Sequence, residues 1–108
     1  MFARIELRRY KISSGQVPFS LWLNAQDNAV GARVRAYVDR IKTGNLAHSR
    51  SVGRGVSELK INFGPGYRIY FLRDGEAIVV LLCAGDKGSQ HADIRRAQEY
   101  AADYWRRK

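Results

Sequence analysis

The chain has 108 residues, of which 45% are hydrophobic, so we expect one folded domain over 1–108, which excludes a multidomain or a wholly disordered protein. Nineteen Lys and Arg against ten Asp and Glu give a net charge of +9, and fourteen of the basic residues are Arg. A charge of this size, carried mainly by planar guanidinium groups, predicts a polyanion or an acidic protein as the partner.

The first half of the chain predicts one strand and two helices. Residues 3–10 alternate between apolar and charged side chains, as in a half-exposed strand, and their charges leave no apolar segment for a secretory signal. Pro18 opens a short helix that ends near Asn28. A second, amphipathic helix starts at Ala29 and closes at Gly44.

The second half changes from a helical period to a period of two. Three strands are predicted, at residues 56–63, 67–73 and 77–83. The turns between them are Gly-Pro-Gly and Asp-Gly, and Asp-Gly is typical of a two-residue hairpin. A last amphipathic helix begins at Ser89. We therefore expect an α+β fold, in which a small, mostly antiparallel sheet packs on the helical hairpin and is followed by a C-terminal helix.

Strand register predicts which side chains share a face of the sheet. The Gly-Pro-Gly loop is expected to pair Lys60 with Tyr70, and the Asp-Gly hairpin to pair Arg68 with Leu81. The apolar residues then face the helices, and the opposite face collects Glu58, Lys60, Asn62, Arg68 and Tyr70. The exit of the last strand brings Lys87 next to Arg68.

This polar face carries the candidate catalytic residues. Arg68, Lys87 and Lys60 supply donors that could stabilise a pentavalent phosphorane, and Glu58 or His91 could transfer protons. Because RNA supplies its own nucleophile, the 2′-hydroxyl, such a site needs no metal. The alternative is a solvated strand face whose charges only keep the sheet soluble. Arg68 has no acid directly across from it in the expected register, which favours an anion.

Further RNA contacts are expected from Arg50, Arg54, Asn62, Tyr70 and Arg95. The first two belong to residues 44–55, which are rich in Gly, Ser and Asn without periodicity and so predict a basic loop. For the aromatic residues of the helices, Tyr37 among them, core packing is favoured over base stacking.

Other kinds of site are not expected. The glycine runs lack the pattern and context of a nucleotide-binding loop, so no cofactor is predicted. His48, His91 and Cys83 are the only soft metal ligands, and no spacing brings two of them onto one ion. Cys83 is the only cysteine and cannot form an internal disulfide, which predicts a reduced, cytoplasmic protein. The apolar run 77–84 is too short to span a membrane.

Three stretches of the second half are specific when taken together: Ser57–Ile61 (SELKI), Gly64–Phe71 (GPGYRIYF) and Leu82–Gln90 (LCAGDKGSQ), followed by Asp93-Ile94. They closely resemble the addiction module killer proteins, a HigB-like branch of the RelE/ParE toxin superfamily. The resemblance implies a RelE-like fold and the toxin of a type II toxin-antitoxin pair. Such toxins are usually endoribonucleases that cut mRNA in the ribosomal A site.

The resemblance also implies roles for single residues. Arg68 matches the phosphate-binding Arg of the superfamily, Lys87 the basic residue after the last strand, and Lys60 a basic residue of the preceding strand. Ribosome-dependent relatives often have a catalytic Tyr or His after the final strand. Here no Tyr stands between Ala84 and Glu99, and His91 and Asp93 are the only substitutes, with a strand Glu, Glu58, as another candidate base.

The partners implied are mRNA, the ribosome and a small acidic antitoxin. In this branch the antitoxin typically carries a helix-turn-helix domain, through which the pair would contact operator DNA indirectly. Two alternatives stay open. One is a ParE-like inhibitor of DNA gyrase that acts by protein contact through the helical hairpin 18–43, and the other is a catalytically inactive module that only binds the antitoxin.

Overall fold

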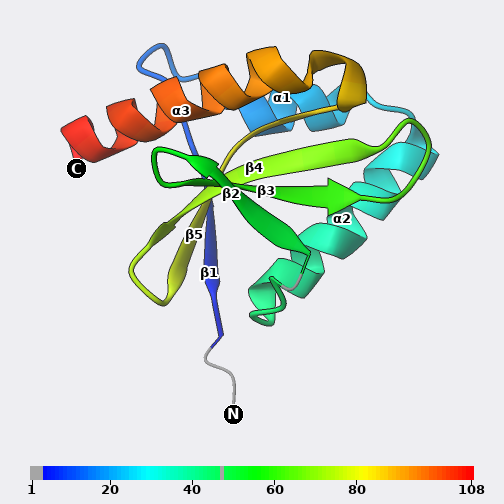
Figure 1. Cartoon of the computed structure of the whole chain (residues 1–108), viewed down its shortest axis with the longest axis horizontal. Helices are drawn as coiled ribbons and strands as arrows, with labels where there is room; N and C mark the ends of the chain where they lie inside the picture. The colour runs from blue at the N-terminus through cyan, green and yellow to red at the C-terminus, as the bar shows by residue number, and fades with distance from the viewer. Residues whose placement is uncertain (1–3, 47) are drawn as a thin grey trace.

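The computed structural model describes residues 4–46 and 48–108 and shows a five-stranded sheet with three α-helices (Figure 1). The elements in chain order are β1 (Glu6–Arg9), α1 (Pro18–Asn24), α2 (Asn28–Lys42), β2 (Ser49–Gly53), β3 (Val56–Ile61), β4 (Tyr67–Asp74), β5 (Ile78–Gly85), the short 3-10 helix η1 (Lys87–Ser89) and α3 (Gln90–Arg107). The strand order is β1-β5-β4-β3-β2, with β1 parallel to β5 and all other pairs antiparallel. The predicted α+β class is confirmed, and the arrangement is compatible with a RelE-like fold.

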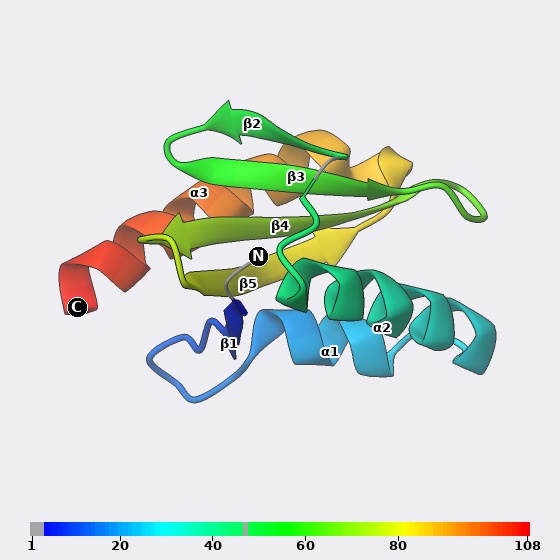
Figure 2. The ribbon, with the colours of Figure 1, turned by 90° about the horizontal axis from the view of Figure 1, so that it is seen from below.

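The sheet lies between two layers of helices (Figure 2). The hairpin of α1 and α2 buries Phe19, Val34 and Ile41 against one face of the sheet. The longer α3 covers part of the other face with Ala97 and Ala101, whose small side chains let the helix approach the strands closely. Strand β5, which lies between β1 and β4, is buried on both faces, as its continuous apolar sequence predicts.

The prediction of a basic loop over residues 44–55 is wrong in part, because this segment contains strand β2. This edge strand pairs with β3 and exposes side chains on both faces, so its sequence, SRSVG, has no apolar alternation to reveal it. Arg54 lies in the turn between β2 and β3 with a φ of 55°, between two glycines that also have positive φ.

The predicted pairing of β3 with β4 is displaced by two residues. Ile61 lies opposite Tyr67, so the connection is longer than the Gly-Pro-Gly loop expected, and Lys60 lies opposite Arg68 instead of Tyr70. A shift of two residues leaves every side chain on its predicted face, since successive side chains of a strand alternate between faces.

The predicted pairing of β4 with β5 is also wrong. Asp74 pairs with Ile78 across a three-residue turn, and the register shifts again at Tyr70 and Phe71. As a result Arg68 lies opposite Gly85, at the exit of β5, and not opposite Leu81. Gly75 lies in this three-residue turn with a φ of 73°, a left-handed conformation that glycine adopts without strain.

Candidate functional site

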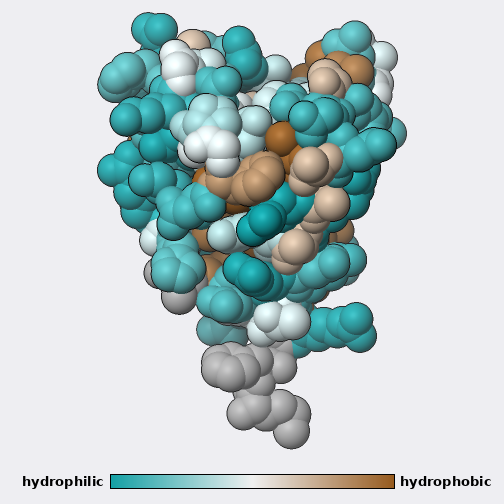
Figure 3. Space-filling view, turned by 90° about the vertical axis from the view of Figure 1, so that its right-hand side faces the viewer, coloured by the Kyte–Doolittle hydropathy of each residue, from teal (hydrophilic) through white to brown (hydrophobic). Residues whose placement is uncertain are grey.

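Two adjoining hollows form a basic groove where β3, β4 and the start of α3 meet. Their volumes are about 370 Å³ and 410 Å³, and they share Lys60 and Arg68. The first is lined by Lys60, Asn62, Phe63, Gly64, Pro65, Gly66, Arg68 and Lys87, and the second by His48, Arg50, Glu58, Lys60, Arg68 and Gln90. The side of the molecule shown in Figure 3, where the β3–β4 turn and the start of α3 lie, is largely hydrophilic, with hydrophobic residues gathered in its middle.

Arg68 and Lys60 are like charges directly opposite each other on neighbouring strands, which is unfavourable without an anion between them. Arg68 is 7% exposed, and its Nη1 donates to the carbonyl oxygen of Gly66 at 2.9 Å. Gly66 has a φ of 85°, a left-handed backbone conformation that only glycine adopts easily. The loop therefore needs a glycine at the position whose carbonyl oxygen binds the Arg68 guanidinium. Among the described residues, Lys60 and Lys87 have no carboxylate within 4.0 Å.

Glu58 is the one carboxylate that lines the groove. It is 3% exposed, accepts hydrogen bonds from Arg50 Nε and Gln90 Nε2 at 3.0 Å each, and lies 3.7 Å from Arg68 Nε. Burial raises its pKa, but the hydrogen bonds from Arg50 and Gln90 outweigh burial, and the net pKa of Glu58 is lowered. Glu58 therefore stays ionised and holds two arginines at the groove.

The position of Lys87 is set by a tight turn after β5. The carboxylate of Asp86 accepts the backbone N–H groups of Gly88 and Ser89, and Ser89 Oγ donates to the buried Asp93 at 2.5 Å. Asp93 fits against the backbone of Gly85, where a Cβ would come within 2.8 Å of its Cγ. These contacts place Lys87 in the same hollow as Arg68, as the sequence predicts.

Several predicted site residues lie outside the groove. Tyr70 is fully buried beneath α3, which contradicts a direct RNA contact, and burial and nearby Glu58 raise its pKa. Arg54 lies in the β2–β3 turn, and His91 and Arg95 are exposed on the first turns of α3; none of these three lines either hollow. Arg50 and Asn62 do line the groove, as expected.

His48 and Gln90 are the groove residues that sequence reasoning missed. His48 precedes β2, and only the pairing of β2 with β3 brings it to the groove. Gln90 begins α3 and reaches Glu58 across 32 positions of sequence. The LCAGDKGSQ stretch contains Gln90 and was the only sequence signal that pointed toward it.

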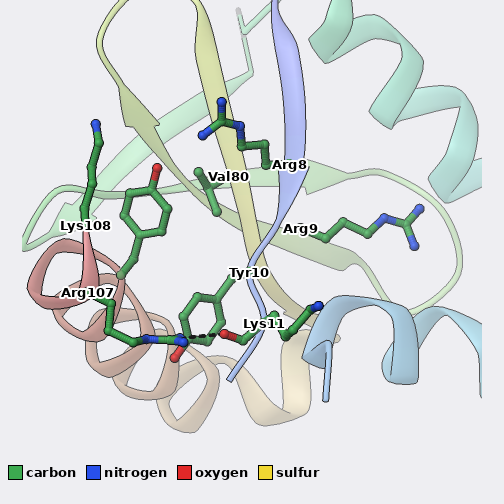
Figure 4. A pocket seen from close by; sticks show the side chains of 8 residues that line it. Arg8, Arg9, Tyr10, Lys11, Val80, Arg107 and Lys108 are labelled. Carbon is green, nitrogen blue, oxygen red and sulfur yellow. Dashed lines mark hydrogen bonds between the residues drawn. The ribbon is translucent and has the colours of Figure 1, made fainter. Parts of the chain in front are cut away.

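A third hollow, of about 300 Å³, lies at the other end of α3 and is also rich in cations (Figure 4). Here four of the five cations that line the hollow have a partner within the chain: Lys108 Nζ lies 2.5 Å from Asp74, Arg107 binds Asp103 and the carbonyl oxygen of Lys11, Arg8 pairs with Glu6, and Arg9 donates to Ser20. Arg9 points away from the other labelled residues (Figure 4). These contacts fasten the end of α3, so the groove is the better anion site.

None of the helices formed by the described residues combines the length and the apolar character needed to cross a membrane. The model of a protein family described as "Phage derived protein Gp49-like (DUF891)" matches residues 21–102. This range includes every residue that lines the groove. The chain belongs to this Gp49-like family. It is also 37% identical over 86 residues to an uncharacterised protein of Haemophilus influenzae, a match that covers 79% of this chain and 87% of the relative.

The Gp49-like family consists of toxin-like addiction module proteins and is associated with the toxins of toxin-antitoxin systems. Membership supports a toxin role and implies, in general terms, an antitoxin as partner.

Proposed function

We propose that this toxin-like protein is a metal-independent endoribonuclease of the HigB-like kind that cuts mRNA on the ribosome. The observation that carries the proposal is the convergence of three cations, Lys60, Arg68 and Lys87, in one hollow, where Glu58 pairs, of these three, with Arg68 alone and, among the described residues, leaves Lys60 and Lys87 without a carboxylate within 4.0 Å. A scissile phosphate in this hollow would remove the repulsion between Lys60 and Arg68. The proposal therefore gives these three residues the role of binding that phosphate.

In the proposed reaction the 2′-hydroxyl of the substrate loses its proton and its oxygen attacks the adjacent phosphorus. The bond to the 5′-oxygen then breaks, and that oxygen takes up a proton. Negative charge grows on the non-bridging oxygens in the transition state, where donors fixed in advance by the protein are most effective. The guanidinium of Arg68 is held by Gly66 and Glu58, and the capped turn fixes the backbone that carries Lys87.

Among the described residues that line the groove, Glu58 and His48 carry a carboxylate and an imidazole, the groups that most often serve as proton acceptors in catalysis. The lowered pKa of Glu58 makes it a weak base, and both its oxygens already accept hydrogen bonds. We therefore assign Glu58 to positioning Arg50 and Arg68, and the proton to His48. This differs from the assignment to Glu58 or His91 that the sequence suggests.

The test is cleavage of a translated message in a purified translation system, mapped by primer extension. The wild type is expected to cut within codons, and Arg68→Ala to lower the rate at least about a hundredfold. Arg106→Ala is the matched control, because it removes an exposed Arg at the far end of α3, and it should cut like the wild type. Inhibited DNA supercoiling by gyrase without mRNA cleavage would instead support a ParE-like toxin.

The antitoxin expected for this toxin is acidic, with a helix-turn-helix domain that contacts operator DNA. The supporting observation is the net charge of +9, with a groove that holds four cationic side chains against one carboxylate. Charge-driven encounter predicts an association rate that falls steeply with added salt.

A further inference from the structure

Two arginines of α2 stack on aromatic rings at the border of the basic groove. The guanidinium carbon of Arg33 lies 4.6 Å from the centre of the Phe63 ring, and that of Arg40 lies 4.6 Å from the centre of the Tyr37 ring. Phe63 lines the groove itself. Tyr37 and Arg40 line a small hollow of about 110 Å³ that shares His48 with the groove.

Both arginines keep their hydrogen-bond donors available. They are exposed, and neither has a carboxylate within 4.0 Å among residues 4–46 and 48–108. Stacking on a ring holds a guanidinium plane in place without using its N–H groups. By contrast, Lys42 on the same helix lies 4.0 Å from Asp39, and Arg107 binds Asp103. The two α2 arginines are thus both oriented and unneutralised.

Their spacing places them on one side of α2. Residues seven apart in a helix lie almost in line, about 10 Å from each other along the axis. Arg33 marks the Phe63 end of the groove and Arg40 the end reached through His48. Because α2 covers the face of the sheet opposite Lys60 and Arg68, the two stacks border the groove from the α2 side, one at Phe63 and the other beside His48.

We propose that the Arg33–Phe63 and Arg40–Tyr37 stacks bind nucleotides of single-stranded RNA on either side of the one to be cut. The proposal rests on the proposed function and extends it from the scissile phosphate to its neighbours. Each guanidinium offers two parallel N–H groups to a phosphate, and its outer face is a platform for a base. Tyr37 packs against the core and thereby supports the Arg40 platform, so the core role expected from the sequence and the RNA role act together.

The test compares affinities for two 2′-O-methyl RNA probes, which cannot be cut, by fluorescence anisotropy. One is a trinucleotide that fits the groove alone, and the other is a single strand of about twelve nucleotides. Arg33→Ala/Arg40→Ala should weaken binding of the long probe about tenfold and leave the trinucleotide unchanged. The slope of log affinity against log salt should fall by about 1.4 for the long probe if each arginine holds one phosphate.

Arg35→Ala/Lys42→Ala is the matched control, because it removes the same charge at the same spacing from another side of the same helix. Equal losses in the two double variants would overturn the proposal, since net charge alone would explain them. The proposal would also be overturned if Arg33→Ala/Arg40→Ala bound RNA like the wild type but bound the antitoxin more weakly. That result would make α2 a protein-docking surface. If the wild type binds neither probe, this proposal fails, while the proposed function is decided separately by the cleavage assay on the ribosome. If Arg33→Ala/Arg40→Ala weakens binding of the long probe only, this proposal stands.

Discussion

Replacing Gly85 with alanine should break the turn that carries Lys87. The added Cβ would lie 2.8 Å from both the Cγ of Asp93 and the Oγ of Ser89, and closer still to an oxygen of Asp93. Asp93 cannot retreat easily, because it is 3% exposed, accepts from Ser89 Oγ at 2.5 Å and pairs with Arg96 at 3.2 Å. The backbone of Gly85 does not have a positive φ, so the effect of alanine comes from the clash alone.

The expected loss of stability has two parts. Forcing a methyl group into filled space costs about 1–3 kcal/mol, and displacing the Asp93 carboxylate from Ser89 costs about 1.5–3 kcal/mol more. A loss of about 2.5–6 kcal/mol is a large part of the free energy of unfolding of a domain of this size, which is about 5–15 kcal/mol. At a urea dependence of about 2 kcal/mol per molar, the unfolding midpoint should fall by about 1.2–3 M.

Urea unfolding followed by tryptophan fluorescence measures this loss. Gly88→Ala is the milder comparison, since its Cβ would meet only Asp86 Oδ1 at 3.3 Å, a contact that a shift of a few tenths of an ångström relieves, and it should cost less than about 1 kcal/mol. In an Asp93→Ala background, Gly85→Ala should cost about 2 kcal/mol less than in the wild type, because the clash with the Asp93 carboxylate is gone. A Gly85→Ala protein within about 0.5 kcal/mol of the wild type, or an equal cost in both backgrounds, would refute the reasoning.

Three other predictions concern buried groups. The pKa of Glu58 in the folded protein lies below its ordinary value of 4.5, so the ionised carboxylate contributes its full stabilisation above pH 4.5 and loses it as the pH falls through the folded pKa. The difference in free energy of unfolding between the wild type and Glu58→Gln should therefore shrink in acid. A difference that stays constant with pH would contradict this prediction. Tyr70 Oη is buried beside Glu58 without a partner at full hydrogen-bond geometry among the described residues, so Tyr70→Phe should change the free energy of unfolding by less than about 1 kcal/mol in urea titrations, and a larger loss would show that Tyr70 binds Glu58. Burial raises the pKa of the Cys83 thiol to about 12, so iodoacetamide should modify it only after unfolding, and alkylation of the native protein at mildly alkaline pH would refute its burial.

The sequence predicts the faces of the sheet better than the pairing of its strands. Alternation along β3 and β4 places Glu58, Lys60 and Arg68 on one face, and this survives a register error of two residues because a strand repeats every second residue. The pairing itself depends on the lengths of turns, which Gly-Pro-Gly and Asp-Gly do not determine uniquely. Arg68 and Lys87 are nonetheless brought together, since both lie at the exit end of β5 in the actual register.

What the sequence could not predict depends on long-range packing. The alternation of β4 does not predict that α3 covers Tyr70 and leaves Arg68 at the edge of the covered area. Which part of the sheet Ala97 and Ala101 contact depends on how α3 packs in the complete fold. Similarly, β2 has exposed side chains on both faces, and only its pairing with β3 brings His48 to the groove. Both misses concern residues whose surroundings are formed by segments distant in the chain.

The cations that make up the net charge of +9 differ in whether a carboxylate of the same chain neutralises them. At the end of α3, Arg107 and Lys108 are neutralised by Asp103 and Asp74, so mutating them should affect mainly stability. At the groove, Lys60 and Lys87 have no such carboxylate in the described part of the chain, and a folded protein keeps such unfavourable charges together only at a cost to its stability. Lys60→Gln should therefore stabilise the free protein slightly while it weakens RNA binding. This opposition between stability and binding is what distinguishes a binding site from a solvated strand face, for which both effects would be negligible.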